Sequence, residues 1–418
     1  MHFSYRLSSV SSAAVFAAVL GVVGVTAPVS AGTAPLVVKL TAGDGAELDR
    51  FGYSVALDGG RALVGSILDA ENGVRSGSAY LFDAATGNLA AKLVPSNASG
   101  ADFFGISVAL NGNTALIGSD SDDDNGSASG SAYLFDAATA TQTTKLTAAD
   151  AAAGDNFGVS VALDGGKALV GSYRDDANGS ASGSAYVFDS ATGNQLVKLV
   201  ASDGAPNDRT GFAVALDAGT ALVGSYRDDG IAAGSAYLFD AATGTQSAKL
   251  TPADSAPGDQ FGISVALDNG TALVGGFRFD GTNAGSAYLF DAATGSQLGT
   301  LSAPDGVAGN AFGVSVALDG NLALVGSSRN GGAAYLFDIT TGAFLTKLTA
   351  FDGEPNDFFG FSVALDDGLA IVGAWGADGV VADAGAAYVF DVSAFVPEPA
   401  SATLLLAPAW ALGRRRQA

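Results

Sequence analysis

Aspartates that follow one apolar segment are the side chains best suited to chemistry. Asp120, Asp122 and Asp124 alternate with other residues, and clustered carboxylate oxygens are the ligands that calcium prefers. The run does not match an EF-hand loop, because its glycine is displaced to Gly126 and the closing glutamate is missing. The spacing predicts a calcium site at Asp120, Asp122 and Asp124. Capping of loop backbone by the same carboxylates is the alternative.

An aromatic residue stands directly before an arginine in three loops, and a tryptophan lies in a fourth: Tyr173-Arg174, Tyr226-Arg227, Phe277-Arg278 and Trp375. Aromatic and arginine side chains dominate the energetic centres of binding interfaces. These residues therefore predict a ligand-binding rim. The alternative is that each arginine contacts an aspartate of its own loop while the aromatic rings pack inside the fold.

Acids spaced five residues apart recur in other loops. The pairs are Asp44 and Asp49, Asp150 and Asp155, Asp203 and Asp208, Asp254 and Asp259, and Asp352 and Asp357, with Asn97 and Asn310 standing in for an acid in two further loops. A feature present in every copy of a repeat is usually part of the scaffold. We interpret the pairs as acceptors for the N–H groups of their own loops.

The residue types that are missing exclude most catalysis. The 418 residues include no cysteine and one histidine, His2. Disulfides, thiolate chemistry, a Ser-His-Asp triad and histidine-ligated metals are therefore excluded. Hydrolysis of glycosides by paired carboxylates needs a singular pair of acids, and every acid in this sequence has copies in the other repeats. We predict a protein that is not an enzyme, with a carbohydrate-active enzyme using loop carboxylates as the alternative.

Composition and charge bound the fold and the partners. Apolar residues make up 48% of the chain and there are 58 glycines, a proportion that suits turn-rich β structure. The net charge of −23 comes from 42 acidic against 19 basic residues. We expect no nucleic-acid partner, because such a chain repels phosphate backbones.

Residues 1–31 have the layout of a secretory signal peptide. His2 and Arg6 precede an apolar run, and small residues lead up to Ala31. We expect cleavage after Ala31 and export of the rest of the chain.

The other end, residues 394–418, has a Pro-Glu-Pro sequence at Pro397, a short apolar run, and Arg414-Arg415-Arg416. This order resembles the PEP-CTERM sorting signal of bacteria. The resemblance implies processing by an exosortase-type enzyme, transient membrane contact through this segment, and a secreted or cell-surface product.

One motif, Phe-Gly-x-Ser-Val-Ala-Leu, recurs between these segments. It begins at Phe51, Phe104, Phe157, Phe261, Phe312 and Phe359, with a degenerate copy at Thr210. Each copy contains four stretches with the alternation or turn signals of strands. Seven four-stranded units at intervals of 47 to 53 residues predict an all-β fold, a seven-bladed β-propeller of antiparallel blades over residues 32–393.

Counting strands predicts how the ring closes. A Lys-Leu strand precedes the first Phe-Gly motif, and none follows Asp391. Leu36–Leu40 should therefore supply the fourth strand of the last blade and leave no free sheet edge.

The recurring Phe-Gly motif, followed by Gly-Ser or Gly-Ala as at Gly171-Ser172, resembles FG-GAP repeats such as those of the integrin α-subunit propeller. The calcium loop of the integrin repeats does not carry over, because the connection between the first two strands is only Leu-Asp-Gly-Gly or similar. The resemblance implies a non-catalytic secreted or surface protein that binds matrix polysaccharide or another surface protein. A purely structural envelope protein is a further alternative.

Overall fold

The computed structural model describes residues 33–228, 233–277 and 283–396. The predicted signal peptide, Arg278 and the predicted sorting segment from Pro397 onward lie outside the described residues. Among the described residues, the model contains no helix long and apolar enough to cross a membrane.

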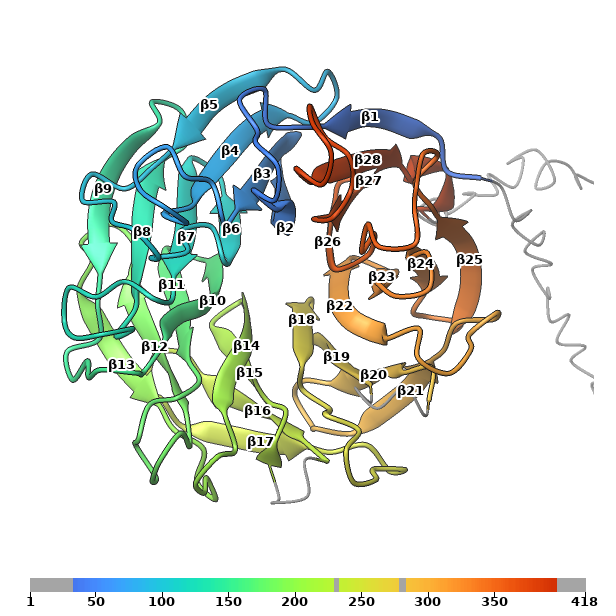
Figure 1. Ribbon diagram of the computed structural model, residues 1–418. Coiled ribbons are helices and arrows are strands. Elements are labelled where there is room, and N and C mark those ends of the chain that lie inside the picture. Colours follow the sequence, from blue (N-terminus) through green and yellow to red (C-terminus); the bar gives the residue numbers. More distant parts are fainter. Residues whose placement is uncertain (1–32, 229–232, 278–282, 397–418) are drawn as a thin grey trace, which may run out of the picture. The chain divides into compact units, whose positions relative to one another are not determined.

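In the described ranges, twenty-eight strands form seven four-stranded antiparallel sheets, which are the blades of a ring (Figure 1). The first three blades contain β2 (Phe51–Asp58), β3 (Arg61–Ser66), β4 (Ser78–Asp83) and β5 (Leu89–Leu93); β6 (Val108–Asn111), β7 (Thr114–Ser119), β8 (Ser131–Asp136) and β9 (Thr141–Leu146); and β10 (Phe157–Asp164), β11 (Lys167–Ser172), β12 (Ser184–Asp189) and β13 (Gln195–Leu199). The fourth to sixth contain β14 (Thr210–Asp217), β15 (Thr220–Ser225), β16 (Ser235–Asp240) and β17 (Gln246–Leu250); β18 (Ser264–Asp268), β19 (Thr271–Gly276), β20 (Ser286–Asp291) and β21 (Gln297–Leu301); and β22 (Phe312–Asp319), β23 (Leu322–Ser327), β24 (Ala333–Asp338) and β25 (Ala343–Leu348). The seventh contains β26 (Ser362–Asp366), β27 (Leu369–Ala374), β28 (Ala386–Asp391) and β1 (Leu36–Leu40).

The predicted closure by the N-terminal strand is confirmed. β1 pairs antiparallel with β28, with Leu40 opposite Ala387 and Leu36 opposite Phe390. Figure 1 shows β1, in blue, beside the red strands of the seventh blade. A strand from the start of the chain therefore completes the sheet that the end of the chain begins.

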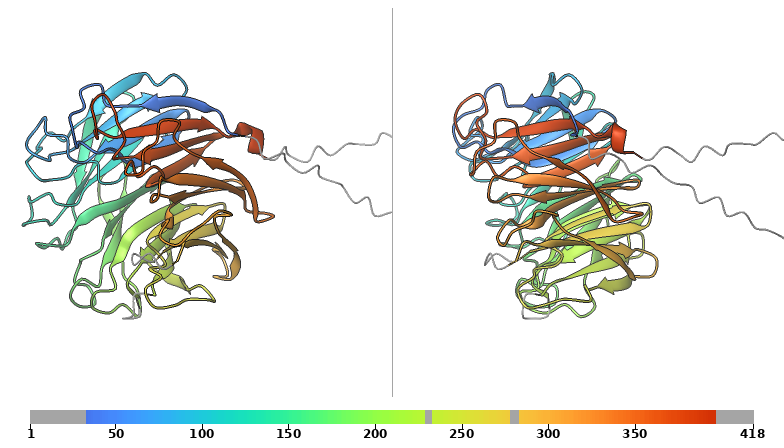
Figure 2. Two further views of the ribbon diagram at one scale, coloured as in Figure 1. Left: turned by 45° about the vertical axis from the view of Figure 1, so that its right-hand side comes forward. Right: turned by 90° about the vertical axis from the view of Figure 1, so that its right-hand side faces the viewer.

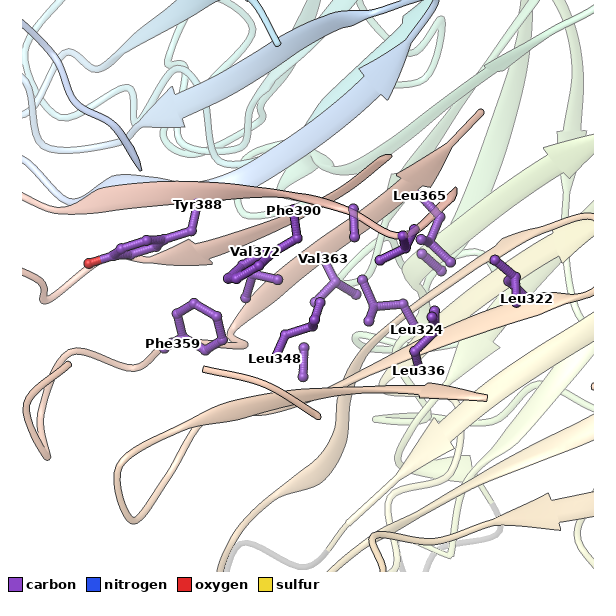
Figure 3. Packing of buried hydrophobic residues seen from close by; sticks show 14 of the residues in the cluster. Leu322, Leu324, Leu336, Leu348, Phe359, Val363, Leu365, Val372, Tyr388 and Phe390 are labelled. Atoms are coloured by element: carbon purple, nitrogen blue, oxygen red, sulfur yellow. The ribbon is translucent and has the colours of Figure 1, made fainter. Parts of the chain in front are cut away.

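The Phe-Gly motif explains how neighbouring blades pack. The phenylalanine is buried, and its ring meets the tyrosine and phenylalanine of the third strand edge-on, as Phe51 does with Tyr80 and Phe82. Figure 3 shows one interface between blades, where Phe359 lies near Tyr388 and leucines of the sixth blade such as Leu336 lie nearby. Each interface removes a layer of apolar surface from water, which is the main term that stabilises the ring.

The two faces of the ring differ. The first and second strands are joined by tight turns such as Asp58 to Arg61, where Gly59 and Gly60 have positive φ as a primed hairpin turn requires. Longer loops lie on the other face, and in the right-hand view of Figure 2 they project to the left. The 3-10 helix η2 (Ser393–Phe395) lies on the turn face, since the N–H of Val392 donates to Gly368 in the turn between β26 and β27.

Candidate functional site

The innermost strands surround a central cavity of about 430 Å³. Its wall is built mainly from the Phe-Gly-x-Ser-Val segments, because these segments form the first strand of each blade (Figure 1). The residue after each Phe-Gly, or after Gly211 in the degenerate copy, lines the cavity in all seven blades: Tyr53, Ile106, Val159, Phe212, Ile263, Val314 and Phe361. A cavity of this size suits a small molecule or a group on a larger one.

Two further sets of residues hold equivalent places at the long-loop ends of the first and second strands, and Phe277, Ala311, Ser328, Phe358 and Trp375 of these sets line the cavity. One set precedes the first strand or Phe-Gly motif: Arg50, Phe103, Asn156, Arg209, Gln260, Ala311 and Phe358. The other follows the second strand: Ile67, Asp120, Tyr173, Tyr226, Phe277, Ser328 and Trp375. We call these two sets, with the seven residues after the Phe-Gly motifs, the mouth of the cavity.

The backbone of the mouth repeats while its side chains do not. All seven residues of the first set are left-handed, with φ between 51° and 61°. In several blades, the residue that follows the member of the second set donates its backbone N–H to a carbonyl oxygen in the loop before the first strand. Examples are Leu68, which donates to Asp49, and Arg174, which donates to Asp155. Because the scaffold fixes equivalent places and the side chains there differ, the mouth departs from sevenfold symmetry in its side chains while it keeps that symmetry in its backbone. Variable side chains on a rigid scaffold are typical of binding sites.

One aromatic cluster is centred on Trp375. Its ring stacks on Phe358 at 4.1 Å between centroids, and the guanidinium of Arg50 lies 4.7 Å from its centroid. Phe361 meets the indole edge-on. Since two groups cannot share one face at these distances, Phe358 and Arg50 cover the two faces of the indole. Its buried Nε1–H has no hydrogen-bond partner in the protein.

A second cluster surrounds Arg209. Its guanidinium lies 5.6 Å and 5.7 Å from the ring centroids of Tyr173 and Tyr226, and it also contacts the Tyr226 hydroxyl. Phe212 meets both tyrosine rings edge-on. The Arg209 Nε atom is buried without a partner. Tyr226 belongs to an apolar group with Phe277, which is only 2% exposed.

Tyr173, Tyr226, Phe277 and Trp375 thus hold equivalent places after the second strands of four blades, and Phe277 and Trp375 line the cavity. Ligand binding by these residues stays a prediction. Arg174 and Arg227 are exposed beside the mouth. The alternative, in which each arginine contacts an aspartate of its own loop, does not describe Arg174 fully. The guanidinium of Arg174 lies over the ring of Tyr173.

Sequence reasoning missed Arg50, Arg209 and Arg329. Arg329 holds the place of Arg174 three loops further on and lies 5.9 Å from the Phe277 ring. The signal that could have found Arg50 and Arg209 is their position directly before the first strand.

Asp120 is singular, which contradicts the interpretation that every acid has copies. The equivalent places in the other six blades carry no carboxylate. Asp120 accepts a hydrogen bond from Ser121, and Tyr53, Tyr173 and Arg174 are near enough to interact with it electrostatically. Burial raises the pKa of this carboxyl to about 6.

The three aspartates of the predicted calcium site do not converge. Lys145 binds the carboxylates of both Asp122 and Asp124, and the Tyr133 hydroxyl donates to Asp122 at 2.5 Å. Asp120 lies instead at the mouth. No group of three or more acidic, histidine or cysteine side chains that could hold a metal occurs in the described ranges. The ammonium group of Lys145 therefore binds two of the carboxylates that were predicted to bind calcium. Calcium binding by this loop stays a prediction.

Asp122 takes part in a tyrosine–aspartate–lysine contact that recurs in other blades. It is 1% exposed. Burial acts to raise its pKa, but hydrogen bonds from Tyr133 and Lys145 outweigh burial and hold that pKa below its ordinary value. The same tyrosine–aspartate–lysine contact joins Tyr186, Asp175 and Lys198.

The interpretation of the five-spaced acids as acceptors for the N–H groups of their own loops is confirmed only for the second acid of each pair. The first acid of a pair binds the lysine of the fourth strand, as Asp150 binds Lys198 at 2.7 Å. The second caps its own loop, as Asp155 accepts the N–H of Ala152 at 2.8 Å.

Acids also surround the other end of the cavity, at the turns between the first two strands. Each of several carboxylates accepts a backbone N–H from the turn of the next blade, as Asp58 does from Gly112 and Asp366 from Gly59. Burial, and then the neighbouring Asp58, raise the pKa of Asp366. These acids join successive blades and leave the turn face negative.

A family model described as FG-GAP repeat matches seven segments of the chain, residues 36–82, 88–135, 140–188, 194–239, 245–290, 296–337 and 344–390. Each segment holds the fourth strand of one blade and the first three of the next, which is why the first repeat begins with β1. No curated protein matches the chain.

Proposed function

The chain belongs to the FG-GAP repeat family, and we propose that it is a non-catalytic, secreted or cell-surface propeller that binds matrix polysaccharide at the mouth of its central cavity. The observation that carries the proposal is the contrast between uniform blades and divergent mouth side chains. Aromatic and arginine residues gather at this opening, and both types dominate binding energetics.

The shape of the mouth favours a polysaccharide over a surface protein. A concave cavity of about 430 Å³ accepts a sugar chain end or side group, whereas a stable protein contact usually buries a surface of about 800 Å² on each partner. Aromatic rings with polar atoms beside them offer sugars both apolar contact and hydrogen bonds. The binding experiment below distinguishes a polysaccharide ligand from a surface-protein ligand.

We further propose export by the N-terminal segment and sorting by an exosortase-type enzyme. Both ends of the described chain lie near the turn face. The N–H of Asp391 donates to Pro35, and η2 packs beside Gly368 on that face. A protein retained by its C-terminal segment would therefore present the mouth away from the point of attachment. Intact-mass analysis of the native protein checks the processing, since a product that retains Arg414 to Arg416 contradicts it.

A carbohydrate-active enzyme is the second candidate, and Asp120 is the observation that favours it. A carboxyl with a raised pKa is the kind of group that serves as general acid in glycoside hydrolysis. That chemistry needs a second carboxylate about 5 to 9 Å away, and two of the next three acids along the chain, Asp122 and Asp124, are held by Lys145.

The experiment is a polysaccharide array with the mature propeller, read for binding and for release of reducing sugar. We compare Trp375→Ser, which places at this position the residue that Ser328 provides in the previous blade, with Phe351→Ser. Phe351 is an aromatic residue on the same face, and its side chain is 72% exposed. It packs on Tyr388 and does not belong to the mouth.

Binding that Trp375→Ser weakens at least tenfold and Phe351→Ser leaves unchanged supports the proposal. Sugar release identifies the enzyme. Capture of a surface protein with no glycan bound, or equal effects of the two substitutions, contradicts a polysaccharide site at the mouth.

A further inference from the structure

Most of the described basic side chains fall into two groups, whereas Arg61, Arg75 and Lys167 belong to neither. The lysines of the fourth strands are held by carboxylates at the outer part of each blade: Lys39, Lys92, Lys145, Lys198, Lys249 and Lys347. Arginines gather instead around the mouth. Arg50, Arg174 and Arg209 make no ion pair with any carboxylate in the described part of the chain, although the whole protein carries a charge of −23.

Two of these arginines lie beside one ring. The guanidinium carbons of Arg174 and Arg209 are 5.1 Å and 5.6 Å from the centroid of Tyr173. Two positive charges therefore lie beside one ring, and like charges repel each other. Arg227 follows Tyr226 at the next equivalent place and adds a third positive charge on the same side of the mouth.

Carboxylates of the described residues lie near this group without forming an ion pair with it: Arg174 shares a surface pocket with Asp150, Asp155, Asp175 and Asp176. Asp120 accepts its hydrogen bond from Ser121, and its carboxylate is not within ion-pair distance of Arg174. The Nε–H of Arg209 is buried without an acceptor, as is the Nε1–H of Trp375 across the mouth. A buried donor without an acceptor is unfavourable, so an oxygen-bearing anion that reaches Arg209 would stabilise the mouth by accepting a hydrogen bond and by neutralising the neighbouring positive charges.

We propose that the arginines around Tyr173 bind the anionic group of an acidic polysaccharide, a uronate carboxylate or a sulfate. This inference rests on the proposed function and names the class of sugar. Arginine suits the task because its planar fork of donors matches an oxyanion and it stays charged at every relevant pH. The rest of the protein is acidic, so recognition depends on this one positive region instead of overall charge.

The test is calorimetric titration of the mature propeller with three probes of equal length. They are a galacturonic acid tetramer, its fully methyl-esterified form, and a sulfated galactan tetramer. The ester has the same sugar rings without the charge. We expect the acid to bind about 10- to 100-fold more tightly than its ester, the range of one to two charged hydrogen bonds. The sulfated probe shows which of the two anionic groups the arginines prefer.

Arg209→Gln should reduce binding of the acid to the level of the ester. Glutamine is compatible with this backbone, because Gln260 adopts the same left-handed conformation in the next blade. Arg174→Ala, at an exposed position, is a second variant that should weaken binding without affecting folding. Arg61→Gln is the matched control, since Arg61 lies on the turn face beside Asp58.

Equal binding of the acid and its ester overturns the anionic specificity but leaves a neutral polysaccharide ligand possible. Loss of acid binding in Arg61→Gln as well overturns the assignment to the mouth arginines. If no glycan of any charge binds, the proposed function itself fails.

Discussion

The Cα of Gly373 lies against the carbonyl oxygen of Gly52, so closely that a Cβ on Gly373 would overlap that oxygen. The Ser362 hydroxyl donates to the same oxygen at 2.9 Å. The same contact joins Gly65 and Gly105 in the first two blades. The interface between the last and first blades is therefore built like the others, and the second glycine of the repeat is required by the neighbouring backbone.

We expect Gly373→Ala to destabilise the propeller by at least about 2 kcal/mol, because the added methyl group forces the two blades apart. Gly299→Ala is the control, since no atom lies within 4 Å of a Cβ placed on Gly299. Denaturant unfolding of both variants measures the difference. Equal stability of the two would show that this contact between blades is not tight.

Leu40→Ala should destabilise the closed ring by about 2–5 kcal/mol, the range for deleting a buried leucine side chain. Leu40 is 1% exposed, whereas Leu36 on the same strand is 38% exposed. Leu36→Ala should therefore have a much smaller effect. A chain that begins at Thr41 should aggregate, because it exposes the edge of β28. A monomeric truncated protein with an unchanged melting temperature would contradict closure by β1.

Asp120→Asn should stabilise the protein at pH 8 and have little effect at pH 4. The pKa of Asp120 is raised to about 6, chiefly by burial, so its contribution to stability is present below pH 4 and is lost as the pH rises through 6. A shift of two units corresponds to about 3 kcal/mol at most, and partial exposure reduces this to about 1–2 kcal/mol. Thermal melts across this range, with the exposed Glu47→Gln as control, measure the effect. Stabilisation that is independent of pH would rule out titration of Asp120 as its cause.

Calcium binding is tested best in Lys145→Met, which frees the carboxylates of Asp122 and Asp124. Without calcium this variant should melt at a lower temperature, because Asp122 is buried and loses its positive partner. Calcium at millimolar concentration should restore part of the loss, and should affect the unmodified protein less. The control is sodium chloride of the same ionic strength. If it restores the melting temperature equally, only screening is at work and these aspartates do not bind calcium.

The repeat allowed the fold to be predicted. The contacts between side chains at the mouth could not be predicted, because they depend on how each hairpin folds. The period and the displaced Leu36–Leu40 strand can be counted along the chain. Arg209 and Tyr226 are 17 residues apart and meet because the β14–β15 hairpin places Thr210 opposite Ser225. Asp120 and Asp122 are close in sequence but separate, because the chain leaves β7 at the mouth and turns toward the outer Tyr133 and Lys145. Alternation along a loop therefore did not show that the chain carries Asp120 to the mouth and Asp122 toward the outer part of the blade.

The most direct test of the account is a crystal structure of the mature propeller with the polysaccharide fragment that binds most tightly. We expect sugar at the mouth, with an anionic group on Arg209 and contact with Trp375 across the opening. Fragment bound only at the outer loops or at the turn face, with the mouth unoccupied under saturating conditions, would contradict the central claim.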